Sequence, residues 1–78
     1  MTKQAVHKEG VQKAIDYFGS QQALADAINN EFDDRLKQSH IHKWLHLVKK
    51  LPLERAYQIE KVTNGKVTKE NLRSDLFA

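Results

Sequence analysis

The chain has 78 residues, no cysteine and a formal net charge of +3, from 13 lysines and arginines and 10 acids. This length fits one small domain, and 40% apolar with 29% charged residues is typical of a folded globular chain. Disulfides and cysteine-based metal sites are excluded. The longest apolar runs have three residues, as at residues 23–25, whereas a membrane span needs about twenty apolar residues and a signal peptide about seven or more. We therefore expect a soluble cytoplasmic protein that is not an enzyme and uses no cofactor.

Positive charge is concentrated in the middle of the chain. Residues 35–53 contain no acid, whereas residues 1–34 hold three lysines and six acids. The basic residues of this block are Arg35, Lys37, Lys43, Lys49 and Lys50, and the histidines within it are His40, His42 and His46. Such a block in an otherwise nearly neutral chain indicates an anionic partner, and nucleic acid is the first candidate. The simpler alternative is a solvated lysine-rich surface without a partner.

Apolar residues in the first half of the chain repeat at helical spacing. One stripe predicts a helix that ends at Gly19 and consists of Val11, Ala14, Ile15 and Phe18. Ser20 is placed to cap a second helix, because its hydroxyl can accept a hydrogen bond from a free backbone N–H. That helix carries an apolar face of Leu24, Ala27 and Ile28. The pair Asn29-Asn30 is expected to end it.

The third stripe is the clearest and consists of Ile41, Trp44, Leu45 and Val48. At about 100° per residue, the opposite side of this helix holds Ser39, Lys43, His46 and Lys50, with His42 at its margin. We therefore predict a helix with one apolar face for the core and one polar, basic face for solvent or a partner.

Two more helices are expected in the last third of the chain. Pro52 suits the first turn of a fourth helix, where its missing N–H costs nothing. The stripe of this helix consists of Leu53, Ala56, Ile59 and Val62, and the pair Asn64-Gly65 ends it. Thr68 is placed to cap a short last helix that contains Leu72. The sequence predicts an all-α domain of about five helices over residues 1–78, with a short C-terminal tail over residues 66–78.

Two consecutive segments resemble a helix-turn-helix: GSQQALADAI at residues 19–28 and LKQSHIHKWL at residues 36–45. They are similar to phage Cro-type repressors and to the YdaS-like antitoxin family. The later segments LPLERAYQIE (51–60) and TNGKVTKENLRSDLF (63–77) look like the YdaS-like pattern, except that Ser74 stands where proline is usual. The resemblance covers about residues 13–77. It implies a small helix-turn-helix bundle like that of lambda repressor and Cro, with Ala25 where the two helices cross and with Ile41 and Trp44 as buried anchors.

The resemblance further implies a sequence-specific transcriptional regulator of prophage repressor type that binds double-stranded DNA. A major-groove reader presents short or flexible hydrogen-bonding side chains from its N-terminal end. Gln38 can pair with adenine through a donor and an acceptor, and Ser39 can bond a base edge or a phosphate. One turn further on, His42 and Lys43 are placed for guanine or for the DNA backbone. The remaining expected DNA-binding residues are Gln21 and Gln22 at the first turn of the preceding helix, Lys49 and Lys50 where the helix leaves the groove, and Lys37 and His46.

The expected helix-turn-helix contains an insertion at residues 29–35, where the compact motif has a single residue. Either the second helix continues, with Phe32 extending its apolar stripe, or the connection is a longer loop. Asp33 or Asp34 can also cap an earlier start of the third helix, which would move its reading residues a turn inside. Acids in this insertion, Glu31 included, would repel phosphate if they faced the duplex.

Two kinds of partner are expected besides the DNA operator. One recognition helix contacts few base pairs, so we expect a homodimer, at least on DNA, with recognition helices about 34 Å apart on a palindrome. The tail residues that could form the dimer surface can equally pack on the core of the monomer: Val67, Leu72, Leu76 and Phe77. The alternative function is an antitoxin-like module that neutralises a protein partner, a toxin, with or without DNA binding.

Metal binding and catalysis find little in the sequence. His42 and His46 stand four apart on one helix face, which suits zinc, but a structural site normally needs four ligands and no cysteine is present. We therefore expect no metal site. The histidines gain positive charge in mildly acidic solution, and DNA binding is expected to become tighter and less specific there.

Overall fold

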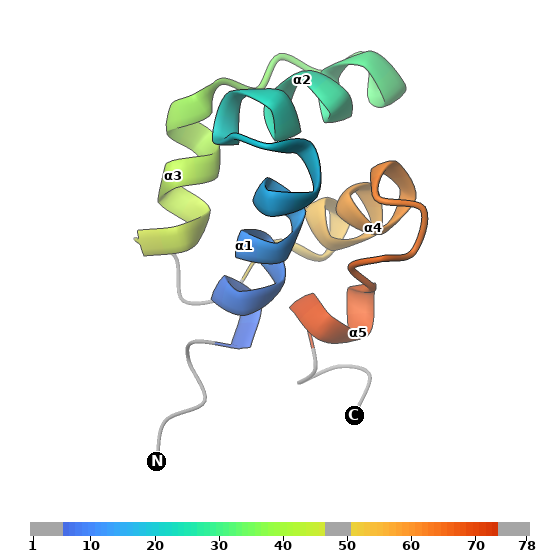
Figure 1. Cartoon of the computed structure of the whole chain (residues 1–78). Helices are drawn as coiled ribbons and strands as arrows, with labels where there is room; N and C mark the ends of the chain where they lie inside the picture. Colours follow the sequence, from blue (N-terminus) through green and yellow to red (C-terminus); the bar gives the residue numbers. More distant parts are fainter. Residues whose placement is uncertain (1–5, 47–50, 74–78) are drawn as a thin grey trace.

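A computed structural model describes residues 6–46 and 51–73. The helices in this part of the chain are α1 (Val6–Phe18), α2 (Gln21–Phe32), α3 (Gln38–His46), α4 (Leu53–Val62) and α5 (Lys69–Leu72), and it contains no strand. The predicted all-α bundle of about five helices is confirmed. In Figure 1, α1 lies in the middle, α2 crosses one end of it, and α3 lies on the side opposite α4 and α5. Within these residues, no helix is both long and apolar enough to cross a membrane.

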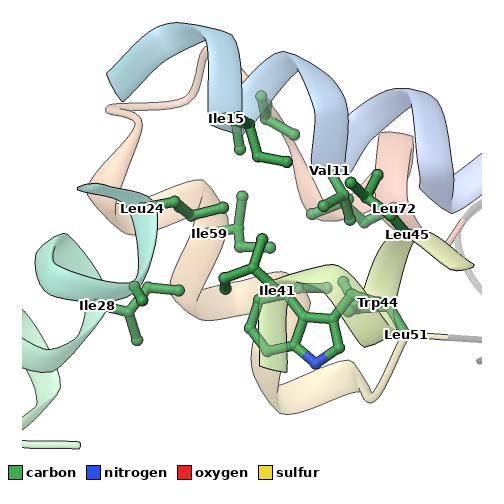
Figure 2. Packing of buried hydrophobic residues seen from close by; sticks show 14 of the residues in the cluster. Val11, Ile15, Leu24, Ile28, Ile41, Trp44, Leu45, Leu51, Ile59 and Leu72 are labelled. Atoms are coloured by element: carbon green, nitrogen blue, oxygen red, sulfur yellow. The ribbon is translucent and has the colours of Figure 1, made fainter. Parts of the chain in front are cut away.

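The apolar stripes of the helices meet in one core, where their side chains point toward one another (Figure 2). α1 packs against α2, α3 and α5, while α2 also packs against α3 and α4. The buried apolar residues are Val11, Ala14, Ile15, Leu24, Ala25, Ile28, Leu36, Ile41, Trp44, Leu45, Leu51, Ala56, Ile59, Val67 and Leu72. The predicted stripes supply most of this core, and Leu36 and Leu51 add to it from the connections. Removal of this apolar surface from water is the main driving force for the fold.

Two glycines shape α1. Gly19 follows its last turn with a φ of +102°, a conformation that favours glycine. The next residue, Ser20, accepts a hydrogen bond from the N–H of Ala23 at 3.0 Å and caps α2, as predicted. Gly10 lets α5 approach closely, because a Cβ at this position would lie 2.6 Å from Leu72 Cδ2.

The end of α2 corrects one prediction, since Asn29-Asn30 does not stop the helix. α2 continues to Phe32 and ends at Asp33, whose φ of 55° is left-handed and whose N–H bonds to the carbonyl of Asn29. The Asn29 side chain remains compatible with the helix because it binds the next connection: Nδ2 donates to Leu36 O at 2.8 Å, and Oδ1 accepts the Leu36 N–H at 2.7 Å. Both alternatives for the insertion thus hold in part. The second helix does continue to Phe32, but Phe32 is 39% exposed and adds little to the buried stripe. A loop follows the helix and is held by the hydrogen bonds between Asn29 and Leu36.

The C-terminal helices begin and end close to the predicted signals. Pro52 lies at the N-cap of α4, immediately before the first turn that it was expected to occupy. Asn64 and Gly65 have φ angles of 54° and 81° and follow its end. Thr68 caps α5 in a reciprocal capping box: its Oγ1 accepts the N–H of Asn71 at 3.1 Å, and Asn71 Oδ1 accepts the Thr68 N–H at 3.2 Å.

The first part of the predicted tail belongs to the core. Val67 is 1% exposed and Leu72 is 2% exposed, so neither offers a surface to a second copy. The fully buried Thr63 holds this segment, because its hydroxyl donates to Ile59 O at 2.8 Å and accepts the Val67 N–H at 3.2 Å. Of the two interpretations of these apolar residues, packing on the monomer is correct. Their companions at positions 76 and 77 lie outside the described residues.

Candidate nucleic-acid interface

α3 begins at Gln38, so the two predicted reading residues at its start lie in its first turn. The alternative of an earlier start capped by Asp33 or Asp34 is therefore wrong. Lys37 occupies the N-cap position, and its N–H is accepted by Nδ1 of His40 at 2.9 Å. Gln38 and the residue after it are both exposed. In this position their side chains lie at the end of the helix that a major-groove reader uses.

α3 has the two faces that its sequence predicts. Ile41, Trp44 and Leu45 are at most 8% exposed and lie in the core (Figure 2). We call the opposite surface the exposed face of α3; it consists of Lys37, Gln38, Ser39, His40, His42, Lys43 and His46. This face contains no acid, and the ring centroids of His42 and His46 lie 4.3 Å apart. It is polar and basic, as expected.

The first turns of α2 and α3 meet at a pair of glutamines. Nε2 of Gln38 donates a hydrogen bond to Oε1 of Gln21 at 2.9 Å, although the residues are 17 positions apart. A side-chain amide has two N–H donors and an oxygen with two lone pairs, so Gln38 retains one donor and its acceptor for a ligand. The sequence indicates each residue separately. Their pairing depends on the packing of α2 against α3 and has no local signal.

Gln22, the other predicted residue of this first turn, has a different environment. Its Nε2 donates to Oδ1 of Asp26 at 2.9 Å, one turn further along α2. A phosphate bound by Gln22 would therefore lie close to a carboxylate. Since like charges repel, Gln21 is the better placed of the two predicted phosphate contacts.

The acid nearest to α3 in the sequence is held by a network of contacts. Asp34 Oδ2 forms an ion pair with Arg55 of α4, and Asp34 Oδ1 accepts the N–H of Arg35 at 2.9 Å. The Arg55 hydrogen bond is the main cause that lowers the pKa of Asp34 below its ordinary 3.8. Arg55 also donates to Gln58 Oε1 at 2.8 Å, and its guanidinium carbon lies 5.9 Å from the Trp44 ring centroid. The negative charge of Asp34, one of the acids expected to repel phosphate, is thus paired with the positive charge of Arg55.

α1 contributes to the surface beside α3. An open groove there adjoins the glutamine pair and is lined by Lys8, Glu9, Gln12, Gln21, Leu45 and His46. The α1 residues of this groove have no local signal in the sequence, because only the packing of α1 on α3 brings them to this surface. The predicted phosphate contacts Lys49 and Lys50 lie outside the described residues. Within the part of the chain that the structure describes, no group of three or more metal-ligating side chains is placed to hold an ion.

The fold and this surface define a small all-helical protein with one polar, basic helix face. Residues 11–78 match the family described as Bacterial toxin YdaS, and the chain belongs to this family. The YdaS-like part of the resemblance is thereby confirmed. The family description names a toxin, whereas the sequence resemblance led us to expect a repressor or an antitoxin. Searches of curated proteins and of solved structures gave no match.

Proposed function

We propose that this YdaS-family protein binds double-stranded DNA with α3 in the major groove and regulates transcription. The observation that carries this proposal is the hydrogen bond between Gln38 and Gln21, which joins the first turns of two helices on one exposed surface. Gln38 reads adenine through its remaining donor and its acceptor, in an orientation that Gln21 fixes. Gln21 and the first N–H groups of α2 bind an adjacent phosphate.

The rest of the exposed face of α3 extends this contact. Ser39, His42 and Lys43 reach base edges or phosphates further along the groove, with Lys37 and His46 beside them. We propose that two copies bind a palindrome in the bacterial cytoplasm, with their α3 helices about 34 Å apart. The two hydrogen bonds between Asn29 and Leu36 support the role of α3 in DNA binding, because they hold the inserted connection between α2 and α3 against α2.

The test is selection of bound duplexes from a random library, with rounds at about 50 and 200 mM salt. The wild type should recover a palindrome that survives the higher salt. The triple variant Gln38→Ala, Ser39→Ala, Lys43→Ala should fold, since all three side chains are exposed, and should enrich no sequence. Lys61→Ala is the matched control, because it removes an exposed positive charge from α4 instead.

Two outcomes would contradict the proposal. Wild-type binding that enriches no sequence and disappears at 200 mM salt would indicate attraction to phosphates alone. A triple variant that recovers the same palindrome as the wild type would place base recognition elsewhere on the protein.

A second candidate function is action on a protein partner, in a toxin–antitoxin relationship. It is favoured by the family description, Bacterial toxin YdaS. Induced expression in a bacterial host separates the two functions. Growth arrest that persists in the triple variant favours a protein target, whereas arrest that disappears with DNA binding favours an effect through transcription.

A further inference from the structure

His40 belongs to the exposed face of α3, but its contact is with the protein itself. Its Nδ1 accepts the N–H of Lys37 at 2.9 Å, and the His40 N–H in turn bonds to the Lys37 carbonyl at 2.9 Å. The N–H of the N-cap residue and the side chain three positions later form the same relation as in a capping box. His40 thus caps the helix at the turn that presents Gln38.

This cap exists only while Nδ1 of His40 carries no proton. In the imidazolium form both ring nitrogens are donors, so an N–H would face the N–H of Lys37. The N-terminal end of a helix also carries partial positive charge, which disfavours a cation at this position. Protonation of His40 therefore breaks its hydrogen bond with the Lys37 N–H, and the new N–H of the ring repels that group.

We propose that His40 is a pH-sensitive positioning residue: acidification releases the start of α3 and lowers the discrimination of DNA sequences by Gln38. This inference rests on the proposed DNA-binding function. His40 acts through the helix end and needs no contact with a base. Histidine is the side chain type whose charge ordinarily changes between about pH 5 and pH 8.

The charged groups that the structure describes around His40 do not form ion pairs with it, so the change in protonation that matters for the cap is that of His40 itself. In the described part of the chain, no acid forms an ion pair with His40. Asp34, the acid nearest to His40 in the sequence, forms an ion pair with Arg55 instead. Among the side chains that the structure describes, α3, its connection and the helices packed against it hold these other titratable or charged groups: Arg35, Lys37, His42, Lys43 and His46, Asp26, Glu31 and Asp33 at α2, and Lys8, Glu9, Lys13, Asp16 and Tyr17 on α1.

The effect of His40 differs from that of the other histidines of the same face. Positive charge added at His42 or His46 would strengthen attraction to the phosphates of any duplex. His40 changes the ratio between the affinities for a cognate duplex and for a scrambled one. The two effects are therefore separated by measuring both affinities at each pH.

The experiment compares the wild type with His40→Gln and His40→Ala at pH 8 and at pH 5.5. The probes are the duplex recovered by selection and a scrambled duplex of the same composition. For the wild type, the affinity ratio should fall roughly three- to tenfold at pH 5.5, the size expected for the loss of one helix cap. His40→Gln keeps an acceptor for the N-cap N–H at both pH values, so its ratio should stay constant. His40→Ala should give a low ratio at both.

An independent readout is the amide proton shift of Lys37 between pH 5 and pH 8 in ¹⁵N-labelled protein. It should titrate in the wild type and stay constant in His40→Gln. A Lys37 amide that does not titrate would overturn the inference, and so would a wild-type ratio that is equal at both pH values. If selection recovers no sequence at all, the proposed function fails and this inference fails with it. A recovered duplex with a pH-independent ratio rejects the role of His40 alone.

Discussion

The buried and exposed faces of α3 lie on the same short helix, but their residues are under different constraints. Ile41, Trp44 and Leu45 fill the core, where every lost methylene leaves a cavity. On the opposite side, substitutions away from special contacts usually change stability by only about 0.5 kcal/mol. Stability therefore explains the buried face and leaves most of the exposed one unexplained. A row of amide, hydroxyl, imidazole and ammonium groups without an acid instead fits a surface that meets an anionic partner.

The largest expected effect comes from breaking the buried face. Trp44→Ala should lower the free energy of unfolding by about 3–5 kcal/mol, because the indole fills the core and lies beside the Arg55 guanidinium. Urea unfolding followed by circular dichroism measures this. Lys43→Ala, one residue earlier on the exposed face, should change it by about 0.5 kcal/mol or less. Similar losses for the two variants would show that the faces are not distinct.

A smaller effect is expected from the clamp that connects α2 to α3, which belongs to neither face. Asn29→Ala leaves the backbone N–H and carbonyl of Leu36 without their partner, and the free energy of unfolding should fall by about 1–3 kcal/mol. The same unfolding assay measures the loss.

Asn30→Ala is the matched control for this clamp. Asn30 is exposed on the same helix, so both variants share the gain in helix propensity that alanine brings. The difference between the two variants therefore isolates the contact with Leu36. Equal stabilities for Asn29→Ala and Asn30→Ala would mean that the clamp contributes nothing.

The helices could be predicted from the sequence because their signals are local. A stripe of apolar residues at helical spacing and a cap such as Ser20 or Thr68 depend on neighbours within a few positions. The end of α2 was mispredicted for a related reason. Asn29 has the local character of a helix stop, but its side chain binds Leu36, seven residues away and beyond the helix.

The candidate site could be predicted only in part, for the same physical reason. The position of a residue such as Lys43 or His46 on the exposed face of α3 follows from helical geometry. The bond between Gln38 and Gln21 and the pair of Asp34 with Arg55 join residues 17 and 21 positions apart. Such contacts appear only after the helices pack. The cap by His40 is short in range, but histidine is not among the residue types that usually mark a helix start.

The smallest expected effect concerns Asp34, which ties the connection before α3 to α4. The Arg55 hydrogen bond lowers the pKa of Asp34, so the folded state favours the charged carboxylate. This stabilisation is present above the ordinary pKa of 3.8 and is lost as the pH falls through the lower value of the folded state. Asp34→Asn should therefore be less stable than the wild type at pH 7 and approach it as the pH falls below about 4.

Thermal unfolding of both proteins between pH 7 and pH 3 measures this difference. Asp33→Asn is the control, since Asp33 has the left-handed backbone that asparagine tolerates and forms no ion pair within the described residues. A gap between wild type and Asp34→Asn that stays constant down to pH 3 would argue against an ionic contribution. It would leave non-ionic differences between aspartate and asparagine, in shape and hydrogen bonding to Arg55 and Arg35, as the origin of the gap. The orientation of the exposed face of α3 would then depend more on the uncharged clamp at Asn29 than on the ion pair.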